Sequence, residues 1–253
     1  MKALITGAAH GLGRALTEEL LHQGHDVVAV DRDTEPLNAL SIINAGACTV
    51  YNADLQNVGS VTRLLTNLRT HEFDLVILNA GISATGKFED IPVVAYDRLI
   101  AVNLFAPIHL ASRLVGDGLM TQKSKIVFIS SLSHAVGYPG GAVYAATKDA
   151  IAAYARSVAK PFKKRRVGVL TVFPGPINTE HAKKHAPDNS DTSKRMEPQK
   201  LAKMILKAAK GRSRIYYPGS RAYFAGMFGR MFPTLATRMM RKGLYEKMKD
   251  PIH

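Results

Sequence analysis

Strand-like and helix-like segments alternate along most of this chain, and that alternation limits its fold more than any other feature. Short apolar segments rich in β-branched residues are each followed by a segment with helical spacing of apolar residues. The alternation predicts an α/β fold, in which a doubly wound parallel sheet of about seven strands lies between two layers of crossover helices. The predicted strands are Lys2–Thr6, Asp26–Asp31, Cys48–Asn52, Leu75–Asn79, Lys125–Ser130, Gly168–Phe173 and Arg214–Tyr217. The predicted helices are Arg14–Gln23, Pro36–Ala45, Val58–Thr70, Tyr96–Val115, Tyr144–Lys160 and Pro198–Ala209.

The size and composition of the chain suit one globular domain. It has 253 residues, of which 46% are hydrophobic and 21% are charged. The single cysteine, Cys48, excludes internal disulfides and metal sites made of several cysteines. We expect neither a membrane-spanning helix nor a secretory leader, because no apolar stretch reaches roughly 18 to 20 residues and the first one runs directly into a glycine-rich turn. These features predict a cytoplasmic protein.

The positive charge of the chain is concentrated in its last third. Residues 1–159 carry 12 Lys and Arg against 14 Asp and Glu, whereas residues 160–253 carry 22 against 6, and the formal net charge is +14. This asymmetry predicts an anionic partner, such as phospholipid headgroups or an acidic substrate. Nucleic acid is not expected, because the basic residues are not part of a recognised nucleic-acid-binding module.

A glycine-rich turn, Gly7-Ala-Ala-His-Gly-Leu-Gly13, joins the first predicted strand to its helix. Glycines permit a tight turn and the close approach of a pyrophosphate, and the start of the helix presents free N–H groups to it. Asp31 ends the second predicted strand about twenty residues further on, where a carboxylate can bind a ribose diol and repel a 2′-phosphate. The turn is spaced GxxxGxG and not GxGxxG, so a plain strand-to-helix turn remains the alternative interpretation.

Tyr144 and Lys148 are four residues apart in a predicted helix, so both side chains project from the same face. A neighbouring ammonium favours the phenolate form and is expected to lower the phenol pKa from its ordinary value near 10. Ser131 follows a predicted strand, at the edge of the sheet where ligand sites of α/β proteins gather. These three residues predict an acid–base site.

In combination, these motifs resemble the classical short-chain dehydrogenase/reductase (SDR) family, in family order from residue 2 to about residue 217. The matches are the Thr6–Gly13 turn, Asp31, Asp54-Leu55, Asn79-Ala80-Gly81, Asn103, Ser131, Tyr144, Lys148, Pro174-Gly175 and Thr179. The resemblance implies one Rossmann-like oxidoreductase domain over residues 1–253. It also implies hydride transfer between a nicotinamide cofactor and a carbonyl or secondary alcohol. The alternative is a non-catalytic dinucleotide sensor or scaffold protein that retains the fold.

The resemblance also implies a role for each catalytic residue. Tyr144 is the general acid and base, and Ser131 hydrogen-bonds the reacting oxygen. Lys148 binds the nicotinamide ribose and lowers the pKa of Tyr144, while Asn103 holds a water molecule of a proton relay.

The implied cofactor site draws on motifs from the whole Rossmann-like region. It consists of Gly7, His10, Gly11, Leu12, Gly13, Asp31, Arg32, Asp54, Leu55, Asn79, Ala80, Gly81, Tyr144, Lys148, Pro174, Gly175, Ile177 and Thr179. Asp31 favours NAD(H), whereas Arg32 and His10 are of a type that accompanies NADP(H) in the family, so that NADP(H) stays open. No metal site is expected, because His181 and His185 have no evident third ligand.

Two segments near the end of the chain belong to no family motif. Residues 178–197 are polar and are predicted to form a substrate lid. Residues 219–253 are predicted to form an amphipathic helical extension, broken at Pro233, in place of the glycine-rich tail that packs in family tetramers. In this extension Phe224, Met227, Phe228, Met231, Leu235 and Met239 recur at three- and four-residue steps among arginines.

Three roles are open for this extension: packing over the substrate cleft or a partner subunit, lying peripherally on an anionic membrane, or binding another protein. The apolar residues predict a fairly apolar small-molecule substrate. We further expect a homodimer or a higher homo-oligomer.

Overall fold

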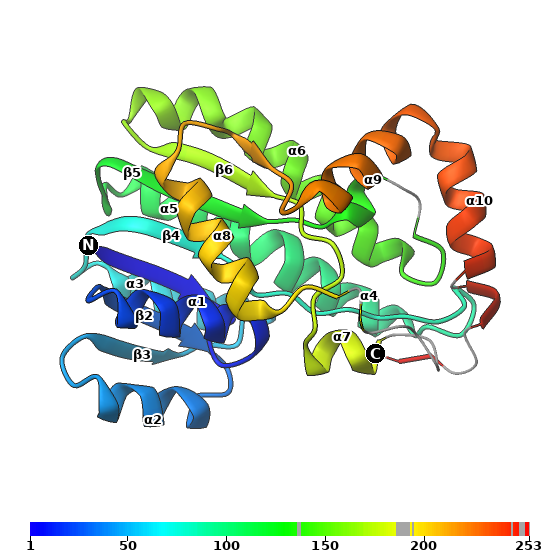
Figure 1. Cartoon of the computed structure of the whole chain (residues 1–253). Helices are drawn as coiled ribbons and strands as arrows, with labels where there is room; N and C mark the ends of the chain where they lie inside the picture. The colour runs from blue at the N-terminus through cyan, green and yellow to red at the C-terminus, as the bar shows by residue number, and fades with distance from the viewer. Residues whose placement is uncertain (136–137, 186–192, 194, 244, 248–250, 253) are drawn as a thin grey trace.

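The computed structural model describes residues 1–135, 138–185, 193, 195–243, 245–247 and 251–252. Its middle layer is a sheet of seven parallel strands in the order β3-β2-β1-β4-β5-β6-β7 (Figure 1). The strands are β1 Lys2–Thr6, β2 Asp26–Asp31, β3 Cys48–Asn52, β4 Phe73–Leu78, β5 Met120–Ile129, β6 Gly168–Val172 and β7 Ile215–Tyr216. The chain builds outward from β1 to β3 and then returns to β4 on the other side of β1. Ligands of doubly wound sheets bind at such a reversal, beyond the carboxyl ends of the strands.

Helices cover both faces of this sheet (Figure 1). They are α1 Gly11–His22, α2 Glu35–Ile43, α3 Val58–Leu68, α4 Val93–Ile100, α5 Ala106–Gly116, α6 Ala142–Lys164, α7 Glu180–Lys184, α8 Pro198–Lys210, α9 Ser220–Met231 and α10 Pro233–Gly243. Three short turns complete the described elements. They are the π-helical turn η1 Ala101–Phe105 and the 3-10 turns η2 Leu132–Ala135 and η3 Tyr245–Lys247. The predicted fold class is confirmed, and each predicted strand and helix is found with shifts of a few residues at its ends.

The two faces of the sheet pack against different sets of helices, because successive residues of a strand point in opposite directions. On β1, Leu4 belongs to the core beneath α3, α5 and α6, whereas Ala3 and Ile5 belong to the core beneath α1 and α8. Both cores are continuous and almost fully buried. The strand ends that carry the site are therefore held rigidly from both sides.

The predicted helix Tyr96–Val115 is wrong in one respect. Helix α4 begins earlier, after Pro92, and passes into α5 through a π-helical turn, Ala101–Phe105. The whole stretch Val93–Gly116 is long and apolar enough to cross a membrane, contrary to our expectation for this chain. Within it, Leu110 and Leu114 are fully buried in the core beneath the sheet, whereas Val93 and Phe105 are exposed.

Both segments outside the family motifs contain helices. The predicted lid contains α7, while residues 186–192 and 194 of that prediction lie outside the described residues. The predicted extension forms α9 and α10, which meet at Pro233 and stand beside the carboxyl end of the sheet (Figure 1). Near the end of the chain, Ile252 forms an isolated antiparallel bridge with Thr85.

Candidate active site

The turn between β1 and α1 has space only for glycine at two positions. Gly7 adopts a φ of +68°, and a Cβ atom added to Gly13 would lie 1.8 Å from the carbonyl oxygen of Gly7. The Asn79 side chain holds this turn from the end of β4, since its Nδ2 donates to the carbonyl oxygens of Thr6 and Gly7, each at 3.1 Å. The result is a fixed, side-chain-free cradle at the start of a helix, which fits a pyrophosphate.

Asp31 lies at the carboxyl end of β2, next to this cradle. Its Oδ2 accepts a hydrogen bond from the backbone N–H of Ala9 at 3.0 Å, and its Oδ1 accepts one from the N–H of Asp33 at 3.2 Å. His10 is directed to another carboxylate, because its Nε2 lies 2.7 Å from Oδ2 of Asp33. The backbone therefore fixes the Asp31 carboxylate where a ribose diol of a dinucleotide would bind.

A single cavity of about 1360 Å³ joins the glycine turn to the predicted catalytic residues. Almost every predicted site residue lines it; the exceptions are Gly13 and Asn103, which lie behind its wall. The lining includes Gly7, His10, Gly11, Leu12, Asp31, Arg32, Asp54, Leu55, Asn79, Ala80, Gly81, Ser131, Tyr144, Lys148, Pro174, Gly175, Ile177 and Thr179.

Strand β5 and helix α6 position the three polar residues of the predicted acid–base site. Ser131 follows the last residues of β5, and its side chain is hydrogen-bonded to that of Tyr144 in the first turn of α6. The Nζ of Lys148 donates to the carbonyl oxygen of Ile129 at 3.0 Å. The hydroxyl of Ser130 is buried and donates to the backbone carbonyl of Lys148 at 2.7 Å, which ties α6 to the end of β5. These contacts fix Tyr144 and Lys148 relative to the sheet.

Burial determines the protonation of Tyr144 and Lys148. It raises the pKa of Tyr144 to about 12, and the hydrogen bond with Ser131 only partly opposes this change. Burial also lowers the pKa of Lys148 to about 8. In this structure the Tyr144 pKa thus lies above its ordinary value, opposite to the direction expected from Lys148, because desolvation is the largest influence on it. Tyr144 is a protonated phenol at neutral pH.

Asn103 lies in the π-helical turn with a side chain that is 1% exposed. Its Oδ1 accepts from the N–H of Ile82 and its Nδ2 donates to the carbonyl oxygen of Ile82, both at 2.9 Å; Nδ2 also lies 3.2 Å from Oγ1 of Thr147. The amide thus anchors the segment after β4 to α6. The predicted role of Asn103 in holding a relay water stays a prediction.

Gly81 lies close to Lys148 and Asn103, where the structure leaves little space. A Cβ atom at this position would lie 3.2 Å from Nζ of Lys148 and 3.4 Å from Oδ1 of Asn103. Glycine lets the backbone after β4 approach the ammonium group closely. Gly81 therefore shapes the wall against which a nicotinamide ribose would lie.

The sequence did not predict an aromatic stack behind Ser131. The ring of His134 is buried 4.0 Å from the Phe173 ring, and its Nε2 lies 3.2 Å from the Tyr217 hydroxyl. Its Nδ1 is 3.6 Å from a carboxylate oxygen of Asp149. The stack links the turn after β5 to the ends of β6 and β7. A lone histidine in a loop gave no signal of this, because the partners come from distant segments.

The predicted lid contacts the segment that follows Gly81. His181 Nε2 lies 3.1 Å from Oγ of Ser83, and His185 Nδ1 lies 3.1 Å from Oγ1 of Thr85. Burial and neighbouring positive charges lower the pKa of both rings, that of His185 to about 4. At its base, the lid is closed by a bridge between Ile177 and Met196. The spacing of these two histidines indicated a possible metal site but not their contacts with Ser83 and Thr85. Among the described residues, no group of three metal-ligating side chains is found.

Part of the remaining cavity wall comes from the turn η2, the residues that follow it, and the segments near the end of the chain that match no family motif. Apolar side chains of the turn η2 and of α9 and α10 dominate it, accompanied by the aromatic Tyr138 and the cationic Arg195. These residues are Leu132, Tyr138, Arg195, Ala225, Phe228, Ala236, Met239 and Met240. The amphipathic pattern predicted the helices that carry several of them, but not which face would meet the cavity.

Comparison with known proteins gives consistent matches. Residues 1–190 match the family model described as short chain dehydrogenase. The NADPH-dependent 1-acyldihydroxyacetone phosphate reductase of Saccharomyces cerevisiae is 33% identical over 72% of this chain, and the match covers 63% of that protein. An uncharacterized oxidoreductase of Staphylococcus epidermidis is 28% identical over 81% of this chain and 89% of its own length.

Among solved structures, a short-chain dehydrogenase from Sphingobium yanoikuyae in complex with NADPH is similar to this chain. It superposes with a TM-score of 0.78 and 26% identity, covering 91% of this chain and 93% of that one.

Proposed function

Because the chain belongs to the short chain dehydrogenase family, we propose that it transfers a hydride between a nicotinamide cofactor and a ketone or secondary alcohol, with Tyr144 as the general acid and base. One observation carries this proposal: the Ser131, Tyr144 and Lys148 side chains open into the same cavity as the glycine cradle. A protein that only senses dinucleotides does not require a phenol and a hydroxyl arranged for proton transfer to a second ligand.

A bound nicotinamide cofactor would supply the hydride, while the chain supplies binding, orientation and the proton. The glycine cradle suits its pyrophosphate, and Lys148 and Gly81 suit its nicotinamide ribose. NAD(P) use is common to the family. For the choice between the two forms we propose NAD(H), since the Asp31 carboxylate would face a 2′-phosphate. The NADPH-dependent relative and the NADPH complex of the Sphingobium protein favour the other outcome, for which Arg32 in the cavity wall is available.

The protonation states favour the reduction direction at neutral pH. The Tyr144 hydroxyl, with its pKa raised to about 12, retains its proton until charge develops on the carbonyl oxygen of a substrate, and then donates it. The Ser131 hydroxyl is placed to hydrogen-bond the same oxygen. The alcohol product then carries the proton from Tyr144 on oxygen and the hydride on carbon. Oxidation reverses these steps, with Tyr144 as the base.

The wall formed by η2, α9 and α10 supports a bulky and largely apolar substrate. Phe228, Met239 and Met240 provide an adaptable apolar surface, because methionine side chains adjust to irregular shapes. Arg195 lines the same cavity. Burial raises the pKa of the Tyr138 phenol, and the nearby positive charge of Arg195 partly opposes this change. We therefore propose a ketone with a large apolar portion.

The decisive experiment compares Tyr144→Phe with the parent protein in NADH- and NADPH-dependent reduction of a panel of aryl, steroid and long-chain alkyl ketones. We expect kcat to fall by about 10²- to 10⁴-fold, with cofactor affinity, measured by nucleotide fluorescence, unchanged. Tyr154→Phe is a matched control, because Tyr154 also lies on α6 but its hydroxyl contacts Ser112, outside the cavity. If the parent binds a dinucleotide and reduces none of the ketones, or if Tyr144→Phe retains full activity, the proposed role is wrong.

A further inference from the structure

Helix α9 presents a stripe of large apolar side chains to solvent. Phe224, Met227 and Met231 are 66%, 44% and 64% exposed. They lie opposite the face of α9 that packs onto the domain, where Ala222 and Gly226 are buried. A Cβ atom on Gly226 would lie 2.8 Å from the Tyr217 ring, so this face is held close to the domain. The orientation that exposes the apolar stripe is therefore fixed by packing.

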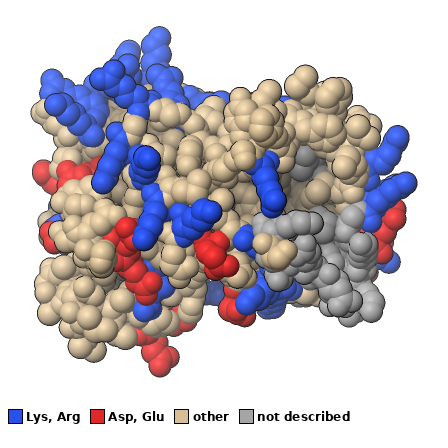
Figure 2. Space-filling model, viewed as in Figure 1, with Lys and Arg blue, Asp and Glu red and all other residues tan. Residues whose placement is uncertain are grey.

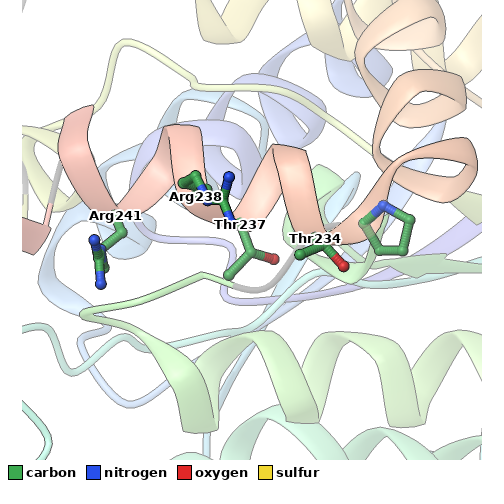
Figure 3. Close-up of a pocket in the computed structure, with 5 residues that line it drawn as sticks. Thr234, Thr237, Arg238 and Arg241 are labelled. Atoms are coloured by element: carbon green, nitrogen blue, oxygen red, sulfur yellow. The ribbon is translucent and has the colours of Figure 1, made fainter.

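Helix α10 presents a cationic face next to this stripe. Ala236 is buried beneath α10, while Thr234, Arg238 and Arg241 project from the opposite side at helical spacing. Together with Pro233 and Thr237, these residues line a shallow pocket of about 570 Å³ (Figure 3). A pocket lined by two guanidinium groups and two hydroxyl groups suits the phosphate of a lipid headgroup.

Positive charge predominates in the sequence of the segment that carries this face. Residues 198–245 include 11 Lys and Arg and no Asp or Glu. Figure 2 shows uncharged side chains over α9 and Lys and Arg side chains along the outer edge of α10. Among the described residues, the acidic group found close to the α10 face is Glu246, whose carboxylate lies 3.5 Å from Arg241. Such a field attracts an anionic surface from a distance.

We propose that this face, formed by Phe224, Met227 and Met231 of α9 and by Arg238 and Arg241 of α10, docks on the surface of an anionic lipid bilayer. The apolar stripe enters the boundary between headgroups and acyl chains, and the arginines contact lipid phosphates. Adjacent apolar and cationic faces are the combination that lies in a membrane interface without spanning it.

The charge pattern favours a lipid surface over a second copy of this chain. A two-fold symmetric dimer would bring the same face of two protomers together, and thus place the arginines of one α10 near those of the other. Among the described residues, Glu246 is the acidic group found there to compensate, and like charges brought together oppose association. A bilayer containing anionic lipids supplies the opposite charge and an apolar layer at once.

Other residues of the same two helices line the active-site cavity. Ala225 and Phe228 of α9 and Met239 and Met240 of α10 form part of its wall. Docking would therefore bring this part of the cavity wall close to the bilayer. This consequence rests on the proposed function: an apolar ketone dissolved in the membrane would have a short path to Tyr144.

Co-sedimentation of the full chain with vesicles tests the proposal. We expect binding to phosphatidylcholine vesicles that contain phosphatidylglycerol, little binding to phosphatidylcholine alone, and loss of binding at high salt. The double variant Arg238→Gln/Arg241→Gln should bind about tenfold more weakly or worse. Phe224→Ser/Met231→Ser should also weaken binding, and binding that persists would then be purely electrostatic, which contradicts insertion.

A matched control removes the same charge elsewhere. Lys200→Gln/Lys207→Gln changes two exposed lysines of α8 and should retain vesicle binding to within about twofold. Equal loss in the control and in the arginine variant would overturn the site, and so would a parent that does not sediment with anionic vesicles. A dimer in light scattering that Phe224→Ser/Met231→Ser dissociates would assign the face to a second copy. None of these residues lines the active-site cavity, so turnover of a soluble ketone reports separately on the proposed function.

Discussion

The ammonium nitrogen of Lys148 lies 5.8 Å from the centre of the Tyr144 ring, and desolvation is the largest influence on the pKa of both groups. Their ordinary pKa values are 10.5 and 10.0, and burial moves the lysine to about 8 and the tyrosine to about 12. Burying the charged Lys148 therefore lowers the stability of the fold, and a substitution of Lys148 can measure this effect.

Lys148→Met should stabilise the protein at neutral pH while impairing catalysis. The pKa of Lys148 is lower in the folded chain than in the unfolded chain, so the unfolded chain binds more protons between pH 8 and 10.5. The free-energy penalty of burying the ammonium is therefore complete below about pH 8. It disappears as the pH rises to 10.5. Removing the amine should raise the free energy of unfolding at pH 7 by up to about 3 kcal/mol, less about 1 kcal/mol for the lost hydrogen bond to Ile129.

Denaturant titrations of parent and variant at pH 7 and at pH 10 check this sign. The advantage of Lys148→Met should shrink at the higher pH, and a difference that does not change with pH would show that Lys148 is not destabilised by burial. Cofactor-dependent turnover of the variant should fall at every pH.

Asp31→Ser should move cofactor preference toward NADP(H). The parent carboxylate is fixed by the N–H groups of Ala9 and Asp33 and would repel a 2′-phosphate, whereas serine removes the charge and leaves Arg32 nearby. We expect the ratio of the Kd values for NADPH and NADH to fall by about tenfold or more. Fluorescence titration of both nucleotides measures it. Asp26→Ser, at the opposite end of β2, is the control, and a ratio that Asp31→Ser leaves unchanged would remove Asp31 from cofactor selection.

His185→Asn should make the protein less sensitive to acid. The His185 ring is 4.6 Å from the ring of His181, and burial, His181 and Lys184 all lower its pKa, to about 4. Because the unfolded ring titrates near its ordinary 6.5, the stability that neutral His185 contributes is complete above pH 6.5 and is lost as the pH falls toward 4. An asparagine can contact Thr85 in place of ring Nδ1 without titrating.

Thermal unfolding at pH 7.5 and pH 5 tests the role of His185. The decrease in Tm between the two pH values should be smaller in His185→Asn than in the parent, while His22→Asn at the exposed end of α1 should behave like the parent. An equal decrease in all three proteins would mean that the lid contact does not contribute to acid sensitivity.

Gly13→Ala should abolish cofactor binding or prevent folding. A methyl group would overlap the Gly7 carbonyl oxygen, and the Asn79 Nδ2 lies only 2.7 Å from the same position, so the turn and its support would both have to move. Gly116→Ala provides the control, because its Cβ meets nothing within 4 Å at the end of α5. Circular dichroism separates misfolding from a folded protein that has lost nucleotide affinity. Normal NADH binding by Gly13→Ala would contradict the described turn.

Local patterns of residue type sufficed to predict the sheet and most of the cavity lining. Runs such as Asp26–Asp31 combine β-branched residues with a following helix, and the glycine turn is defined by backbone space alone. The π-helical turn around Asn103 was not predictable, because its residues have ordinary helical spacing and the insertion serves contacts with Ile82. The raised Tyr144 pKa was missed for a related reason: the spacing of two residues reveals their proximity but not their burial.

The parallel bridge between Ile177 and Met196 joins the two ends of the lid. The N–H of Asn178 donates to the Met196 carbonyl oxygen at 2.9 Å, and the N–H of Met196 donates to the Pro176 carbonyl oxygen at 3.0 Å. Since the closure is made at the base, we expect that the number of residues between these ends can change at a small entropic penalty without displacing β6. We therefore expect that the predicted lid beyond Thr179 can be exchanged to alter the range of substrates while Ser131, Tyr144 and Lys148 keep their positions.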